Sequence, residues 1–449
     1  MKQQTGSCQN YRQQQCHSRR DALRVGSLAL GGLTLGNFFR IPSAQAEQKF
    51  YESKENTAKS VIQIRLGGGV AAQESWNPKP DAPADYRGPF GVTKTSIPGI
   101  VLSETMPQTA KIADKLTVVR SVVGAIPDHG QAMYHMLRGY RMTPAIQHPT
   151  VGTVVNHEFG GRGALPGYVS IGHADDETGY LGAHYGPFAT GGDPAIGNFE
   201  VRDMTLPDGL SWEAFENRKK IRDTINARFR KLDADPAPLD ALDSYYRQAF
   251  DMITSDAVKD AFDLSKEPEK LEERYGKGRF GKTGSQAGMR MLLARRLVES
   301  GVRFVSFGYG GWDHHSNIKP EFETQMPAFD NAFATLIGDL DERGLLDSTL
   351  VWVVSEMGRT PKVNNVAGRD HWSRVFSIAM AGGGLKRGLF YGDADITSSE
   401  PSRDAVPLAN LHSTIYRLIG INSDKELMAP GPRPMEIING GEPIADLIA

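Results

Sequence analysis

Five short apolar runs constrain the fold of this chain more than any other feature. They are SVIQIRLGGG from Ser60, KLTVVRSVV from Lys115, VRFVSFGYGG from Val302, TLVWVVSEMG from Thr349 and VFSIAMAGGG from Val375. Runs of this length that are rich in β-branched residues and end near turns are typical of buried β-strands. Segments with helical spacing lie between them, so the sequence predicts an α/β protein with a doubly wound, mostly parallel sheet.

The helices are predicted from the spacing of apolar residues and from glycine stops. They are HGQAMYHMLRGYR from His129, GMRMLLARRLVES from Gly288, MPAFDNAFATLIGDLDERG from Met326 and LANLHSTIYRLIGI from Leu408. Gly301 is predicted to end the second of them. The stretch from Phe199 to about Lys277 is charged, has helical spacing and lacks strand-like runs. It is therefore predicted to be a helical insertion.

The N-terminus has the pattern of an export signal. Paired Arg19 and Arg20 precede an apolar, Gly-rich segment, and the small residues AQA end just before Glu47. This pattern predicts a twin-arginine signal peptide over residues 1–46, cleavage, and one domain over residues 47–449. The expected location is the periplasm or cell surface, reached through the twin-arginine export machinery. The alternative is an uncleaved anchor, although the apolar core is short for a membrane span.

Cysteine use and charge exclude several classes of function. Cys8 and Cys16 both lie in the predicted leader, so a mature chain would have no disulfide, thiolate nucleophile or Cys-ligated zinc. The leader holds six basic residues and one acidic residue, so the formal net charge of −2 for the whole chain becomes −7 after cleavage. This charge gives no indication of nucleic-acid binding. No mature segment is apolar enough to predict a transmembrane helix.

Polar residues gather just after the predicted strands. They are Glu74 and Ser75, Asp128 and His129, the Asp313–His315 group, Glu356, and Asp370 with His371. Because the carboxyl ends of parallel strands meet at one edge of a sheet, these side chains are expected to converge. Carboxylates and imidazoles are ligands for Zn²⁺, Mn²⁺, Mg²⁺ or Ca²⁺, and Arg359 would offer a planar donor pair to an oxyanion.

Simpler structural roles compete for some of these residues. Asp128 would cap the helix that follows it, and His314 would be a solvated neighbour of the ligands. Asp370 would form a salt bridge with Arg369 or Arg374. These alternatives remain open at the level of the sequence.

The sequence also predicts roles for three further polar residues. His135 and His412 lie inside predicted helices and are expected to be structural. Glu356 follows the apolar run LVWVV, and a carboxylate in that position needs a partner.

Longer motifs resemble the DUF1501 family of exported bacterial proteins, which is related to the sulfatase and alkaline phosphatase fold. The motifs include WNPKPDAPADYRGPF, RSVVGAIPDHGQAMYHMLRGYR, GGWDHHSN, SEMGRTPKVNNVAGRDHW and AGGGLKRG. The resemblance covers nearly the whole mature chain. It implies an alkaline-phosphatase-like, three-layer α/β/α sandwich with a mostly parallel central sheet and a metal site at its C-terminal edge.

The resemblance, together with the gathering of polar residues after the strands, gives expected roles for individual residues. The expected metal ligands or their supports are Glu74, Asp313, His315, Glu356, Asp370 and His371. The expected catalytic residues are Ser75, as nucleophile unless a metal-bound water attacks, Arg359, which would meet the anionic substrate, and His129, which falls near the family's nucleophile position. The cofactor would be a divalent metal (Zn, Mn, Ca or Mg).

The sequence departs from the family pattern at several positions. Glu74, Ser75 and Asn77 replace the usual Asp, Thr and Asp, Met357 stands where phosphatases carry His, and the sulfatase motif C-x-P-S-R is absent. The predicted function is an exported metal-dependent hydrolase of phosphate or sulfate esters on small molecules or polysaccharides. The alternative is a non-catalytic periplasmic or surface binding protein on a partly degenerate fold.

Overall fold

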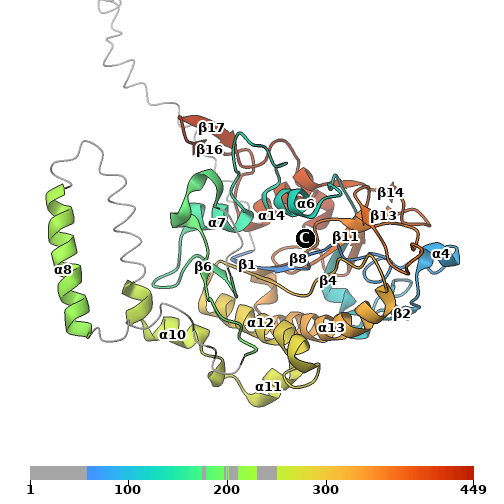
Figure 1. The fold of residues 1–449 in the computed structure, drawn as a ribbon, viewed down its shortest axis with the longest axis horizontal. Helices are drawn as coiled ribbons and strands as arrows, with labels where there is room; N and C mark the ends of the chain where they lie inside the picture. The colour runs from blue at the N-terminus through green and yellow to red at the C-terminus, as the bar shows by residue number, and fades with distance from the viewer. Residues whose placement is uncertain (1–57, 174–177, 197–198, 200, 202–210, 230–249) are drawn as a thin grey trace, which may run out of the picture. The chain divides into compact units, whose positions relative to one another are not determined.

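A nine-stranded sheet forms the centre of the computed structural model, which describes residues 58–173, 178–196, 199, 201, 211–229 and 250–449 (Figure 1). The strand order is β12-β4-β11-β8-β1-β7-β5-β6, and β15 also pairs with β4. The strands are β1 (Ser60–Arg65), β4 (Leu116–Val123), β5 (Tyr168–Ser170), β6 (Phe188–Ala189), β7 (Phe304–Gly308), β8 (Thr349–Val354), β11 (Phe376–Ala381), β12 (Leu389–Tyr391) and β15 (Val406–Pro407). All five predicted runs are therefore strands of this sheet.

One strand runs against the others. β11 pairs antiparallel with both β8 and β4, whereas the remaining pairs in the sheet are parallel. The prediction of a mostly parallel sheet is confirmed, but the prediction that helices alternate with strands throughout is wrong between β8 and β11. Antiparallel neighbours need no helical crossover. The residues that precede β11 consequently lie at the same sheet edge as those that follow β8.

Helices cover both faces of the sheet. The long helices are α6 (His129–Arg138), α7 (Val151–Phe159), α12 (Gly281–Ser300), α13 (Ile318–Glu342) and α14 (Leu408–Ile419). Val351 and Val353 of β8 belong to the core that contains α12 and α13, while Leu350 and Trp352 belong to the core that contains α6, α7 and α14. Figure 1 shows these two helical layers on opposite sides of the sheet. The predicted three-layer α/β/α sandwich is confirmed.

Shorter elements complete the described chain. The other helices are α4 (Ala84–Arg87), α5 (Pro107–Lys111), α8 (Trp212–Phe229), α10 (Asp256–Phe262) and α11 (Glu269–Arg274). The two-stranded ribbons pair β2 (Val92–Lys94) with β3 (Val101–Ser103), β9 (Gly358–Arg359) with β10 (His371–Trp372), β13 (Asp393–Ala394) with β14 (Pro401–Arg403), and β16 (Glu426–Ala429) with β17 (Arg433–Glu436).

The end of α12 agrees with the prediction from the sequence, whereas the start of α13 differs from it. α12 ends at Gly301, whose φ of 113° is unfavourable for residues with a side chain. α13 begins at Ile318, well before the predicted Met326, and Pro327 lies inside it. Buried Ile318 and Phe322 extend its apolar face upstream of the proline. Packing of this apolar face therefore extends the helix upstream of its predicted start at Met326.

The predicted signal peptide and part of the predicted helical insertion lie outside the residues that the structure describes. The predicted signal peptide, residues 1–46, lies wholly outside the described residues. Within the predicted insertion, the described residues form α8, α10 and α11 and contain no strand, and residues 200, 202–210 and 230–249 are outside the description. In the described ranges, no helix is long and apolar enough to cross a membrane.

A buried histidine on the α6 side of the sheet predicts acid sensitivity. His148 stacks on Tyr140 with ring centroids 3.6 Å apart, and burial, with the positive charges of Arg138 and Arg433, lowers its pKa to about 4. Since this pKa lies below the ordinary value of 6.5, the neutral imidazole contributes stability above pH 6.5 that is lost as the pH falls towards 4.

We expect the wild type to lose about 2–3 kcal/mol more unfolding free energy than His148→Phe between about pH 7.5 and 4.5. The phenyl ring keeps the stacking partner of Tyr140 but cannot titrate. Urea denaturation at the two pH values measures the difference. The same pH dependence in both proteins would contradict the assignment.

Candidate metal centre

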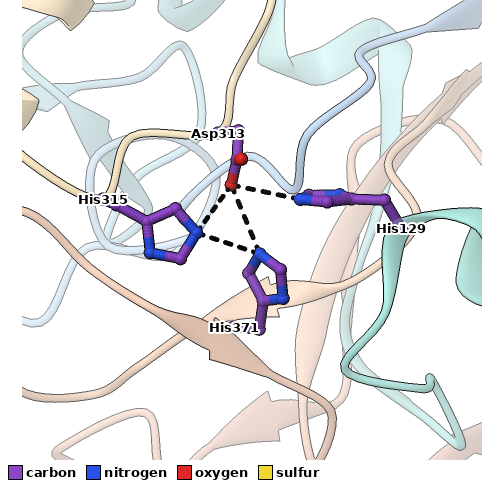
Figure 2. A group of neighbouring side chains, drawn as sticks. All are labelled: His129, Asp313, His315 and His371. Carbon is purple, nitrogen blue, oxygen red and sulfur yellow. Dashed lines mark hydrogen bonds and ion pairs between the residues drawn. The ribbon is translucent and has the colours of Figure 1, made fainter.

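Four side chains from three separate loops meet at the edge where the parallel strands end. His129 begins α6 after β4, Asp313 and His315 follow β7, and His371 lies in β10 just before β11. One ligand atom from each lies within 4.8 Å of every other. Figure 2 shows the three imidazoles and the carboxylate pointing towards one another. We call these four residues the metal-type group.

The spacing of these atoms suits a small divalent ion. Asp313 Oδ1 lies 3.2 Å from Nε2 of His129, 3.0 Å from Nε2 of His315 and 3.3 Å from Nε2 of His371. In a tetrahedral zinc site with bonds of about 2.0–2.1 Å, neighbouring ligand atoms are about 3.3 Å apart. The carboxylate is therefore at coordination spacing from each imidazole.

Each imidazole is oriented by an oxygen on its far side. Nδ1 of His129 is 2.9 Å from Glu356 Oε1, Nδ1 of His315 is 2.7 Å from Asp370 Oδ1, and Nδ1 of His371 is 3.2 Å from the Pro127 carbonyl. A carbonyl or a carboxylate oxygen accepts a hydrogen bond, so in the tautomer that can bind a metal, Nδ1 of each ring donates to this outer oxygen and Nε2 presents a lone pair to the centre.

Two of these lone pairs face each other. Nε2 of His315 and Nε2 of His371 are 3.0 Å apart. With both Nδ1 atoms carrying the proton, two acceptors at this distance repel unless a cation or a further proton lies between them. This arrangement fits a bound metal ion.

The formal charges around the centre also fit a divalent cation. Asp313, Glu356 and Asp370 are three carboxylates, and among the residues that the structure describes, Arg359, which hydrogen-bonds to Asp313, is the one lysine or arginine in direct contact with them. Burial alone would raise the pKa of Asp313, but the hydrogen bond and charge of Arg359, with His129, lower it to about 2. Asp313 is thus ionised, and the formal excess of two negative charges would be balanced by one divalent ion.

The Gly-rich turn after β1 makes the close packing of the loops feasible. Gly68 has a φ of +108°, and a Cβ at this position would lie 2.5 Å from the backbone nitrogen of Asp313. Its own N–H donates to Glu356 Oε1 at 2.6 Å. The glycine therefore lets the loop after β7 approach the turn and also orients the carboxylate that holds His129.

The start of α6 serves two purposes. Asp128 is the N-cap of the helix, and its side chain accepts a hydrogen bond from the Gln131 N–H. The predicted helix cap is confirmed. The cap fixes the first helical residue, His129, at the sheet edge, so the capping role and the placement of His129 are compatible.

The family model described as protein of unknown function (DUF1501) matches residues 58–448. The chain belongs to the DUF1501 family. The match spans nearly all of the described residues, as the sequence motifs predict. No curated protein matches this DUF1501 chain.

Several solved structures are similar to this DUF1501 protein in fold at low sequence identity. Ps i-CgsB in complex with k-i-k-neocarrahexaose is 12% identical, with a TM-score of 0.39 over 81% of this chain and 72% of that one. The lipoteichoic acid synthase LtaP from Listeria monocytogenes is 8% identical, with a TM-score of 0.38 over 86% and 76%. The alkaline phosphatase from the Antarctic bacterium TAB5 is 10% identical, with a TM-score of 0.37 over 81% and 98%.

The DUF1501 structure places Glu74 and Ser75 outside the metal-type group. Both are fully buried. The Glu74 carboxylate is paired with Arg369, whose Nη2 lies 2.7 Å from Oε1, and the Ser75 hydroxyl donates to the Ala71 carbonyl at 2.7 Å. The structure therefore does not bring Glu74 or Ser75 into the metal-type group, and the geometry gives no support to the predicted ligand role of Glu74 or the predicted nucleophile role of Ser75.

Arg359 has a different position from the expected one. Its side chain is 1% exposed, and it donates to the carbonyls of Gly69 and Arg369 at 2.8 and 3.0 Å in addition to Asp313. These contacts occupy the guanidinium, so Arg359 does not meet an anionic substrate. It stabilises the carboxylate of Asp313 and connects the three loops that contain Gly69, Asp313 and Arg369 by hydrogen bonds.

Glu356 and Asp370 each hydrogen-bond to a histidine of the metal-type group. Glu356 is buried and finds the partner that the sequence required, through His129 and the Gly68 N–H. Asp370 is 53% exposed and accepts from His315 and from Asn364, so the salt bridge with Arg369 or Arg374 does not form. Sequence spacing could not distinguish the metal-type group from the carboxylates that hydrogen-bond to it, because both kinds of residue follow strands.

Two histidines outside the metal-type group, His314 and His412, are buried and contact structural neighbours. His314 is buried against Trp312 and Phe322, and its Nε2 is 3.1 Å from the Gln325 side-chain nitrogen, so the prediction of a solvated neighbour is wrong. His412 is buried between the carbonyls of Leu408 and Met136, at 2.7 and 2.9 Å.

Removal of a supporting carboxylate is expected to weaken metal binding. Asp370→Ala frees Nδ1 of His315 to change tautomer, which should lower zinc affinity about 10–100-fold. Because Asp370 is exposed, the melting temperature of the metal-free protein should stay close to that of the wild type. Competition with a chromogenic chelator measures the affinity, and exposed Asp424→Ala is the matched control. Equal affinities in the two variants would contradict the supporting role.

Proposed function

We propose that this DUF1501 protein is a zinc-dependent hydrolase of phosphate or sulfate esters. The observation that carries the proposal is the convergence of three imidazole Nε2 atoms and one carboxylate oxygen at the sheet edge. Imidazole ligands favour Zn²⁺ over Ca²⁺ and Mg²⁺, which narrows the four metals expected from the sequence. Mn²⁺ is the next best fit, because it accepts mixed oxygen and nitrogen ligands.

The residues present supply a binding site that substrate can reach. His129, Asp313, His315 and His371 would hold the ion, which would supply Lewis-acid polarisation of the ester oxygen and a more acidic water. The side chains of Asp313 and His315 are 46% and 44% exposed. One side of the centre is therefore open to an ester from solvent, and the buried Glu356 and Arg359 hold the other side rigid.

The attacking group in this proposal is water. In the part of the chain that the structure describes, no Ser, Thr or Tyr hydroxyl hydrogen-bonds to any of the four residues of the metal-type group. His129 occupies the expected nucleophile position, but its Nε2 faces the group and its Nδ1 donates to Glu356. A covalent side-chain intermediate is accordingly no part of the proposed mechanism.

Turnover of minimal esters tests the proposal. Zinc-loaded protein should hydrolyse p-nitrophenyl phosphate or p-nitrophenyl sulfate at least about 100-fold faster than His371→Ala, since removal of a positioned electrostatic group costs about 10²–10³ in rate. The variant should have lost its metal while keeping its fold by circular dichroism. Equal rates in the two zinc-treated proteins would contradict a reaction at this site.

A second function is favoured by one specific observation. Arg359 is occupied by backbone carbonyls and Asp313, so the centre lacks the exposed guanidinium that the hydrolase hypothesis expected. A non-catalytic metal-containing binding protein fits this feature. Stoichiometric zinc without turnover of either ester would favour that function over the hydrolase.

We also propose that the protein is exported by the twin-arginine machinery to the periplasm or cell surface. The support is the Arg19-Arg20 pair with its apolar segment and AQA site. Residues 1–46 fused to a reporter should direct export of the folded reporter. The Arg19→Lys/Arg20→Lys fusion should stay in the cytoplasm, and export of both fusions alike would contradict this route.

A further inference from the structure

We propose that the ester is carried by an oligosaccharide that lies across two adjoining hollows beside the metal-type group. This inference rests on the proposed ester hydrolase function and names its substrate class. The first hollow has a volume of about 840 Å³ and lies between α4, the start of α13 and residues 360–370. That volume is within the range of about 300–1,000 Å³ typical of ligand pockets.

The first hollow shares a wall with the metal-type group. Asp370 lines the hollow and accepts the hydrogen bond from His315 Nδ1 at 2.7 Å. Asn364 also lines the hollow and donates to the His315 carbonyl at 2.9 Å. A molecule seated there would therefore have one end beside the centre.

The polar lining of this hollow is electrically balanced. Lys362 is paired with Asp85 at 3.2 Å, and Lys319 is paired with Glu323 at 2.8 Å. With both lysines paired to carboxylates, the first hollow has no strong excess of positive charge for a polyanion. Its mixture of donors and acceptors, including the exposed Asn365, matches hydroxyl groups, which both donate and accept.

A second, aromatic hollow continues the path away from the centre. It has a volume of about 360 Å³ and is lined by the partly exposed rings of Phe90 and Phe280, by the buried Phe322, and by polar residues that include Arg279, Glu104 and Asp330. Its Phe90 follows directly on Pro89, which lines the first hollow. Aromatic side chains pack against the apolar faces of sugar rings while polar neighbours bind the hydroxyl groups.

Lys319 lies between the two hollows. Lys319 lines the first hollow, and its Nζ lies 4.9 Å from the centroid of the Phe90 ring in the second. Its partner Glu323 lines the second hollow. The two hollows are thus successive positions along one track that starts at Asp370, and a small ester would fill only its beginning. A chain of several sugars uses both positions.

Binding as a function of chain length tests this inference without relying on turnover. A disaccharide and a hexasaccharide that each carry one sulfate or phosphate ester are titrated calorimetrically into zinc-loaded protein. We expect the hexasaccharide to bind at least about 10-fold more tightly than the disaccharide, because only it reaches the aromatic hollow. Equal affinities, or no binding of any member of the panel, would overturn the inference.

Two variants locate the binding sites. Asn365→Trp fills the first hollow and Phe280→Ala removes an aromatic face of the second, and each should lower hexasaccharide affinity at least about 10-fold. Neither residue belongs to the metal-type group, so zinc content should not change. Ile396→Trp, at a site 60% exposed and outside both linings, is the matched control.

The outcomes separate this inference from the proposed function. Length-dependent binding without ester turnover would contradict the hydrolase and leave the oligosaccharide track supported. Turnover of minimal esters with hexasaccharide affinity unchanged in Asn365→Trp and Phe280→Ala would contradict the track alone.

Discussion

An Asp313→Asn variant is expected to lose more than about 100-fold in zinc affinity, because loss of an outer contact alone costs about 10–100-fold. Asp313 Oδ1 is the atom shared by all three imidazoles, at 3.0 to 3.3 Å. Asparagine keeps the shape of the side chain but removes its charge. It also leaves Arg359 without its carboxylate partner, so a positive guanidinium would then face the incoming cation.

Zinc competition with a chromogenic chelator measures this loss. Asp424→Asn changes the same chemical group at an exposed site and should bind zinc as the wild type does. Because Asp313 is half-exposed, the metal-free variant should keep its fold, and thermal denaturation of the metal-free proteins checks this directly. Wild-type affinity in Asp313→Asn would exclude Asp313 as a ligand.

Replacement of Arg369 by leucine is expected to destabilise the fold by about 3–5 kcal/mol, the cost of breaking a buried ion pair. Arg369 and Glu74 have fully buried side chains. Arg369 also donates to the carbonyls of Thr360 and Tyr86, at 2.9 and 2.8 Å. Burial raises the pKa of Glu74 against the opposing effect of Arg369, so removal of the cation leaves an uncompensated buried carboxyl group.

A double variant and an exposed control sharpen this test. Arg369→Leu/Glu74→Leu removes both charges and should recover much of the lost unfolding free energy. Arg374→Leu breaks the exposed pair with Glu400, at side-chain exposures of 62% and 47%, and should cost less than about 1 kcal/mol. Urea denaturation gives each value. Similar losses for Arg369→Leu and Arg374→Leu would contradict a structural role for the buried pair.

Much of the fold could be predicted from local pattern. Apolar runs mark β1, β4, β7, β8 and β11, because buried strands are continuous in hydrophobicity. The direction of β11 could not be predicted, since an apolar run has the same composition in either direction. The direction depends on the connection from β8, which contains the short β9–β10 ribbon and no helix.

The candidate site could be predicted in part. Asp313, His315 and His371 were found because they adjoin the ends of strands, and the structure brings them together. The pairing of Glu74 with Arg369 spans 295 residues, so no local pattern indicates it. The sequence could not show which residues form the metal-type group and which supply the oxygen beside each Nδ1, because that distinction depends on three-dimensional packing.

Crystallography of the zinc-loaded protein at the zinc absorption edge tests the central claim most directly. An anomalous difference map should contain one strong peak about 2.0–2.2 Å from Nε2 of His129, His315 and His371 and from a carboxylate oxygen of Asp313. Zinc peaks elsewhere with none among these four side chains would contradict a metal centre at this edge of the sheet.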